Sequence, residues 1–195
     1  MALIIQSSFR TEAPIDVVWR VLTNIEVAAP CFPGAQLGEK QEDGTYKGSF
    51  NVKLGPMSFL FAGKFGFVSL DPLTHHAKIN ASGSDTKGRG GAQALVDVQL
   101  TQEATQTLVE IVSDATLSGG VAQFGRGTGM IQALTQQLID QFARQLSVVI
   151  AQDLAASTDA SAPQSLPQEQ PSLAMGSLLW RSFKDWLRGL LKKQT

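Results

Sequence analysis

Cysteine and histidine are scarce in this 195-residue chain. The single cysteine, Cys31, cannot form an internal disulfide, which is compatible with a reducing compartment. The only two histidines, His75 and His76, are adjacent. Neighbouring residues of a strand point to opposite faces, so these two are poorly placed to share a metal ion. We expect both to lie at a solvated strand start and predict no metal site.

Long apolar runs and common catalytic motifs are also missing. No stretch of about 18 uninterrupted apolar residues occurs, so we expect no spanning helix. The N-terminus lacks a basic leader with an apolar core, so we expect a cytoplasmic protein without a signal peptide. HExxH, CxxC and GxSxG are absent, which leaves zinc hydrolase, redox and α/β-hydrolase activities without support. The glycine-rich segment Gly83–Gly91 lacks the Lys-Ser/Thr of a phosphate loop, and we expect a mobile hairpin connection there. We predict no catalytic residues and no enzyme activity.

Charge is nearly balanced overall but polarised towards the C-terminus. The net charge of −1 gives no general attraction for nucleic acid. From Ser172 onward, five cations stand against one acidic residue, Asp185, so this segment alone carries +4. The cationic excess is therefore concentrated in the tail.

The spacing of apolar residues predicts an α+β protein. Period-two alternation indicates strands, and a spacing of 3.6 indicates helices. A strand is predicted at Ala2–Glu12, a helix from near Pro14 and a second helical piece at Ile25–Ala29. Further strands are predicted at Thr45–Leu54, Met57–Leu70, His76–Ala81, Ala92–Thr101 and Thr107–Leu117, before a long helix that runs to about Leu154. Short turns between these strands favour an antiparallel meander. A curved sheet wrapped around one long helix, the helix-grip arrangement, buries both apolar faces in one core.

The predicted inner faces suit an apolar ligand. A long helix across a concave sheet tends to leave space, and these faces carry almost no charge to line it. A fully packed aromatic core is the competing interpretation of the same pattern. The predicted cavity residues are Phe50, Val52, Phe59, Phe61, Phe65, Val96, Val98, Ile111, Phe124, Met130, Leu134 and Leu138.

Beyond the domain at 1–154, composition predicts a linker and an amphipathic helix. Residues 155–172 are rich in Pro, Ser, Gln and Ala, and cannot bury enough surface to order themselves. Residues 173–195 place Trp, Phe and Leu opposite a basic face, the composition of a helix lying on an anionic membrane surface. A protein groove and docking on the chain's own domain are the alternatives. The predicted membrane-binding residues are Leu179, Trp180, Arg181, Phe183, Lys184, Trp186, Leu187, Arg188, Leu190, Lys192 and Lys193.

The chain contains an ordered series of short motifs: Cys31-Phe-Pro-Gly-Ala, Asp43-Gly-Thr-Tyr-Lys-Gly, Lys53-Leu-Gly-Pro-Met, Gly63-Lys64, Leu70-Asp71-Pro72, the segment 83–92 and Ala122-Gln-Phe-Gly. This series resembles the CoxG family of carbon monoxide dehydrogenase subunits, which belongs to the START-like, helix-grip (SRPBCC) superfamily. The resemblance covers roughly residues 2–152.

The resemblance implies a non-catalytic accessory protein that recruits a molybdenum hydroxylase of the CO dehydrogenase type to the cytoplasmic membrane. It also implies movement of quinone between the membrane and the enzyme. Together with the predicted apolar cavity, we expect a bound quinone or lipid, no covalent cofactor, and a peripheral location on the inner face of the cell membrane. A START-like cyclase or hydrolase and a docking scaffold without ligand remain the alternatives, because fold alone does not decide function.

Overall fold

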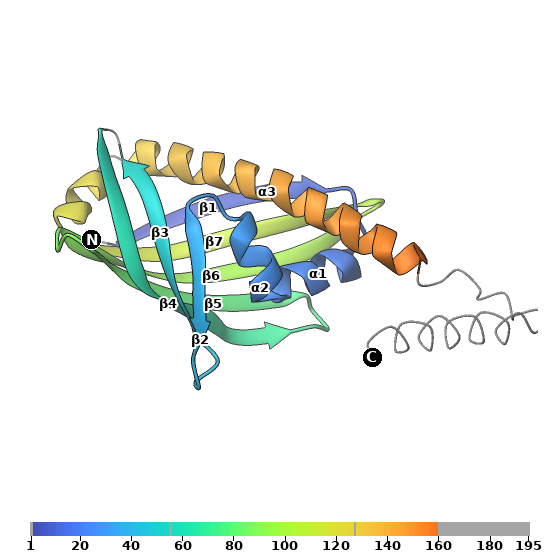
Figure 1. The fold of residues 1–195 in the computed structure, drawn as a ribbon. Coiled ribbons are helices and arrows are strands. Elements are labelled where there is room, and N and C mark those ends of the chain that lie inside the picture. Colours follow the sequence, from blue (N-terminus) through green and yellow to red (C-terminus); the bar gives the residue numbers. More distant parts are fainter. Residues whose placement is uncertain (1, 55, 127, 160–195) are drawn as a thin grey trace, which may run out of the picture. The chain divides into compact units, whose positions relative to one another are not determined.

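A seven-stranded antiparallel sheet and a long C-terminal helix form the domain in the computed structural model, which describes residues 2–54, 56–126 and 128–159. The predicted α+β helix-grip fold is confirmed (Figure 1). The elements in chain order are β1 (Ala2–Thr11), α1 (Ile15–Thr23), α2 (Ile25–Ala28), the 3₁₀ turn η1 (Ala29–Cys31), β2 (Ala35–Lys40), β3 (Tyr46–Leu54), β4 (Met57–Asp71), β5 (His76–Asp85), β6 (Gly90–Glu103), β7 (Gln106–Gly119), the 3₁₀ turn η2 (Gly120–Arg126) and α3 (Thr128–Asp159).

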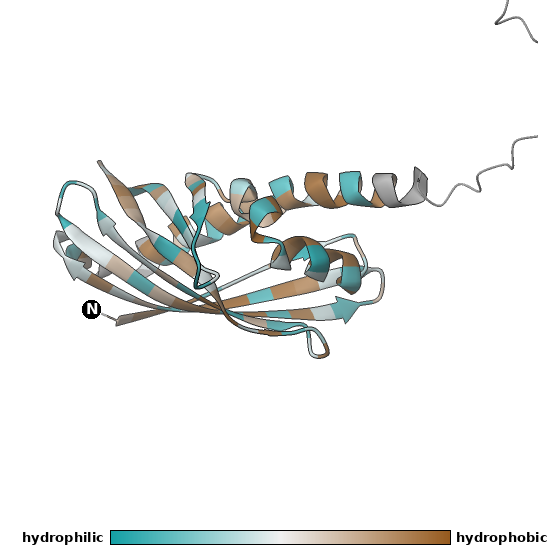
Figure 2. Cartoon of the chain, turned by 60° about the horizontal axis from the view of Figure 1, so that its bottom comes forward, coloured by the Kyte–Doolittle hydropathy of each residue, from teal (hydrophilic) through white to brown (hydrophobic). Residues whose placement is uncertain are grey.

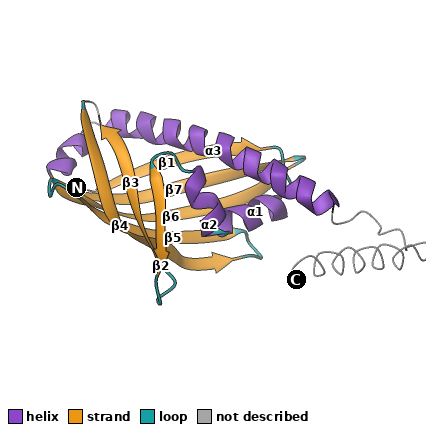
Figure 3. Ribbon diagram, viewed as in Figure 1, coloured by secondary structure: helices purple, strands orange, loops and turns teal. Residues whose placement is uncertain are grey.

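The sheet runs in the order β1-β7-β6-β5-β4-β3-β2, so β1 and β2 are its edges. Figure 2 shows it from the edge, with the helices on one side only, and Figure 3 shows them lying across the strands. The tail predicted at 173–195 and most of the predicted linker lie outside the described residues.

Element ends differ from prediction where the sequence pattern is weak. The strand β2 was not predicted, because Ala35–Lys40 holds a glycine and few β-formers. The helix α3 runs to Asp159 rather than Leu154, so the first residues assigned to the linker are helical. Asp153 forms an ion pair with Arg20 of α1, and Leu154 packs against the core, which ties this last part of the helix to the domain. The compact unit that contains the domain extends to Ala160.

Two separate groups of buried residues hold the sheet and helices together. Cluster 1 joins α1 and the second half of α3 to one end of the sheet, around the fully buried Val18, Val109 and Leu146. Cluster 2 lies at the other end and consists of Val52, Phe59, Phe61 and Val121, with Phe50, Ala92, Leu117 and Leu134 packed around them. The inner face of the sheet is therefore closed at both ends.

Between cluster 2 and the middle of the sheet, a row of glycines crosses three strands. Gly48 pairs with Gly63, and Gly63 pairs with Gly83. A Cβ atom at Gly63 would lie 1.9 Å from the carbonyl oxygen of Ser82, so only glycine allows β4 and β5 to approach this closely. This row permits a sharp local bend of the sheet.

Two glutamines of α3 bind the free edge of β1. Gln132 Nε2 donates to the carbonyl of Gln6, and Gln136 Nε2 donates to the carbonyl of Ser8 at 3.3 Å. Four helix residues and two strand residues advance by similar lengths, about 6 Å and about 7 Å, so the spacings match. These bonds add polar contacts to the apolar packing of α3.

Candidate functional site

Midway along the sheet, the inner face is apolar but only half-buried. Strand pairing places Ala81 beside Ala94, and Ala94 beside Ala115, on the face that packs against α3 elsewhere. The neighbouring row contains Ile79, Val96 and Ser113. We call the following set the middle band; all of its members are half-buried: Phe65, Phe67, Ile79, Ala81, Ala94, Val96, Ser113 and Ala115. The middle band is therefore less buried than the two clusters on either side of it.

Small side chains account for part of this exposure. Three of the positions that face one another across β5, β6 and β7 are alanines, which fill little of the space towards the helix. On α3, Leu134 and Leu138 are also half-buried. Apart from the hydroxyl of Ser113, the middle band carries no polar side chain, which makes it an apolar surface open to an apolar ligand.

The predicted cavity residues divide into two groups. Val52, Phe59 and Phe61 are buried and packed together in cluster 2, where Phe59 and Phe61 stack with centroids 6.1 Å apart. The half-buried members are Phe50, Phe65, Val96, Val98, Ile111, Leu134 and Leu138. The side chains of Phe124 and Met130 lie outside the described part of the structure. The role of the set as a ligand site stays a prediction.

The prediction omitted several members of the middle band. Ile79 and Ala81 alternate with outward residues along β5, and Ala94 and Ala115 do the same along β6 and β7. The alternation alone could have placed them on the inner face. The predicted set consists of large apolar residues, whereas the alanines are the residues that leave room for a ligand.

The glycine-rich β5–β6 connection is the expected hairpin, and an ion pair and several hydrogen bonds hold it in the structure. The carboxylate of Asp85, whose side chain is fully buried, accepts two bonds of 2.8 Å from the guanidinium of Arg89. Arg89 also donates to the carbonyl of Ser58 at 2.8 Å, and its guanidinium lies 4.3 Å from the ring centroid of Phe59. These charge-assisted and cation–π contacts anchor the turn on cluster 2.

Asp85→Asn is expected to reduce stability in a pH-dependent way. The side-chain hydrogen bond from Arg89 lowers the pKa of Asp85 below its ordinary value of 3.8. A lowered folded-state pKa stabilises the fold above the ordinary value, and that contribution is lost as the pH falls towards the folded pKa. The free energies of unfolding of the wild type and the variant, measured in urea, should therefore differ most near neutral pH, and the difference should shrink steadily as the pH falls below about 4. A constant difference over this range would assign Asp85 a packing role instead.

The histidines and the cysteine have structural contacts. His75 lies 3.4 Å from the carboxylate of Asp16 and makes an edge contact with Trp19, so the expectation of a solvated strand start was wrong for it. His76 is 3.0 Å from Asp97. Cys31 is buried, and burial raises the pKa of its thiol, which disfavours the nucleophilic thiolate. Within the described ranges, no group of three or more His, Cys, Asp or Glu side chains could hold a metal ion.

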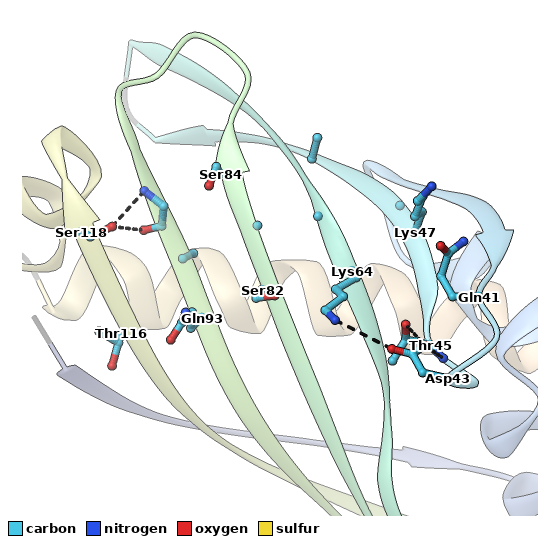
Figure 4. A pocket seen from close by; sticks show the side chains of 16 residues that line it. Gln41, Asp43, Thr45, Lys47, Lys64, Ser82, Ser84, Gln93, Thr116 and Ser118 are labelled. Atoms are coloured by element: carbon cyan, nitrogen blue, oxygen red, sulfur yellow. Dashed lines mark hydrogen bonds and ion pairs between the residues drawn. The ribbon is translucent and has the colours of Figure 1, made fainter.

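A second concave region lies on the opposite, outer face of the sheet (Figure 4). It is an open depression of about 920 Å³, lined mainly by polar side chains, glycines and alanines. A transverse row formed by Lys64, Ser82, Gln93 and Thr116 crosses it, and Lys64 Nζ lies 3.8 Å from Asp43. Its chemistry differs from that of the apolar inner face.

A curved antiparallel sheet gripped by a long C-terminal helix defines a START-like, helix-grip protein. More specifically, the chain belongs to the CoxG family of carbon monoxide dehydrogenase subunits, whose model matches residues 7–151. The resemblance in the sequence motifs is thereby confirmed. A comparison with curated protein sequences gave no match.

Solved structures share this fold at low sequence identity. A conserved protein from Geobacillus kaustophilus is 22% identical, with a TM-score of 0.66 over 77% of this chain and 97% of that one. The Zhui aromatase/cyclase from Streptomyces sp. R1128 is 15% identical, with a TM-score of 0.56 over 80% and 98%. A truncated norcoclaurine synthase from Thalictrum flavum is 15% identical, with a TM-score of 0.53 over 77% and 94%. Among the described helices, none combines the length and hydropathy required to cross a bilayer.

Proposed function

We propose that this chain is a non-catalytic accessory protein that holds a quinone or lipid against the middle band and couples a molybdenum hydroxylase to the membrane. The observation that carries the proposal is the half-exposed apolar surface between two packed clusters. Exposure of such an apolar surface to water is unfavourable. Each 100 Å² of it that a ligand covers contributes about 2.5 kcal/mol to the free energy of binding. An apolar molecule is therefore the class of ligand that this surface favours.

The chemistry of the inner face supports binding rather than catalysis. No member of the middle band is ionisable, so these side chains offer no acid–base pair. Asp97, Glu110 and Asp114 belong to the alternate positions of β6 and β7, which face outward. The aromatase/cyclase and norcoclaurine synthase share the fold, but fold similarity does not transfer their activities.

The family supports the proposed partner enzyme, and the composition of the tail supports the proposed membrane location. The family is named for a subunit of carbon monoxide dehydrogenase, which favours a molybdenum hydroxylase of that type as partner. The basic, tryptophan-containing segment 173–195 is typical of a helix that lies on an anionic membrane surface. We infer a peripheral location at the inner face of the cytoplasmic membrane.

Extraction of bound molecules tests the ligand directly. Full-length protein purified without detergent should release an isoprenoid quinone or lipid into organic solvent, in near-stoichiometric amount by mass spectrometry. An unrelated soluble protein purified from the same cells is the control for carry-over. Repeated recovery of protein without any hydrophobic molecule, together with failure to take up added quinone or lipid, would contradict the proposal.

A further inference from the structure

We infer that Ser7 of β1 recognises a neutral carbonyl oxygen of the bound ligand, an inference that rests on the proposed function. Among the described residues, Ser7 Oγ is the buried side-chain oxygen without a hydrogen-bond partner. The buried hydroxyl of Thr107, in contrast, is paired: its Oγ1 donates to the carbonyl of Ala13 at 2.7 Å. An unpaired hydroxyl in a protein interior is unfavourable and requires an explanation.

The position of Ser7 connects it to the middle band. Ser7 pairs with Ile111 of β7, which pairs with Val98 of β6, and both neighbours are half-buried. Ser113, the one hydroxyl of the middle band, lies two residues along β7 from Ile111, on the same face. Val98 and Ile111 also pack against cluster 1, so they lie at the border between that cluster and the middle band. We expect a ligand that covers the middle band to extend past these two apolar side chains to Ser7.

The backbone carbonyls next to Ser7 already accept hydrogen bonds, so few local acceptors remain for its hydroxyl. The carbonyls of Gln6 and Ser8 accept hydrogen bonds from the Gln132 and Gln136 amides of α3. The backbone of Ser7 itself belongs to the ladder between β1 and β7. An incoming oxygen acceptor on the ligand is thus the group that would satisfy this donor.

The surroundings indicate which acceptor is suitable. A carboxylate would bring a negative charge, and the middle band supplies no cation to pair with it. Arg89, the cation that packs on Phe59, is engaged by Asp85. A neutral carbonyl, from a quinone ring or from an acyl ester, accepts a hydrogen bond without this penalty.

A matched pair of variants tests the inference with the full chain. Binding of three probes is measured by equilibrium dialysis: a decyl naphthoquinone, the decylnaphthalene that lacks its carbonyls, and a decyl ester. Ser7→Ala should weaken binding of a carbonyl probe about tenfold, equivalent to about 1.4 kcal/mol, and leave decylnaphthalene unchanged. Ser8→Ala, on the exposed side of the same strand, should alter none of them. The carbonyl probe that loses affinity identifies the quinone or the ester as the source.

The outcomes distinguish a failure of the proposed function from a failure of the role assigned to Ser7. If the wild type binds none of the probes, the proposed function fails and the role of Ser7 fails with it. If the wild type binds them but Ser7→Ala weakens all equally or none, only the role of Ser7 is overturned. The melting temperature of Ser7→Ala should not fall, because no protein partner is lost; a drop of several degrees would show a structural role and would also overturn the inference.

Discussion

Ending the chain after Ala160 is expected to abolish its co-sedimentation with anionic liposomes. The cut removes the five cations and both tryptophans of segment 173–195, and with them the apolar and electrostatic terms of surface binding. It leaves α3 intact, whereas a cut after Leu154 would remove the last residues of that helix. The melting temperature of the domain should therefore remain unchanged by differential scanning calorimetry.

Two sets of substitutions separate the contributions within the tail. Trp180→Ala with Trp186→Ala should weaken binding at every salt concentration, because apolar burial is not screened. Reversal of Arg181, Lys184 and Arg188 to Glu should weaken it mainly on anionic lipid at low salt. If the truncated domain sediments as well as the full chain, the tail is not the membrane anchor and a protein groove becomes the better interpretation of its amphipathic pattern.

Ala94→Trp is expected to eliminate ligand binding. Ala94 lies in the alanine row of the middle band, paired with Ala81 and Ala115, so an indole there would occupy the surface assigned to the ligand. We expect at least a hundredfold loss of affinity, about 2.7 kcal/mol, and loss of the molecule that co-purifies. The half-buried environment should accommodate the ring without unfolding, which circular dichroism and the melting temperature would verify.

The neighbouring residue supplies the control. Leu95 is 41% exposed on the outer face, so Leu95→Trp adds the same side chain to the same strand without entering the inner face. It should bind ligand as the wild type does. Equal binding by both variants would place the ligand elsewhere or show that none is bound, and equal loss in both would indicate damage to β6 rather than occupation of the site.

The sequence pattern sufficed to predict every strand of the sheet except β2, and alternation placed the aromatic residues of β4 on one face. Phe59, Phe61 and Phe65 lie two or four residues apart along β4 and belong to one face, as period two requires. Alternation could not predict burial depth, because Phe59 is 1% exposed while Phe65 is half-buried on the same strand. Depth depends on what lies opposite, and for Phe59 this includes Val121, more than 60 residues away in the chain.

The contacts of single polar groups were equally inaccessible to sequence reasoning. Asp85 and Arg89 belong to a glycine-rich stretch whose composition is typical of a mobile turn. They nevertheless form an ion pair, and the Arg89 guanidinium packs on the ring of Phe59. In the sequence Ser7 is an ordinary strand serine, and only the folded structure reveals that its buried hydroxyl has no hydrogen-bond partner. Both depend on distances across the sheet, which local propensity does not encode.

The hydrogen bonds between α3 and the edge strand β1 also affect self-association. An open sheet edge can add a strand from another molecule, which is a common route to aggregation. Here the Gln132 and Gln136 amides engage the carbonyls of Gln6 and Ser8, which a foreign strand would need. The opposite edge, β2, is short and its pairing is irregular between Leu37 and Lys40. Loss of the two glutamines should therefore expose the β1 edge and lower the concentration at which the protein begins to aggregate.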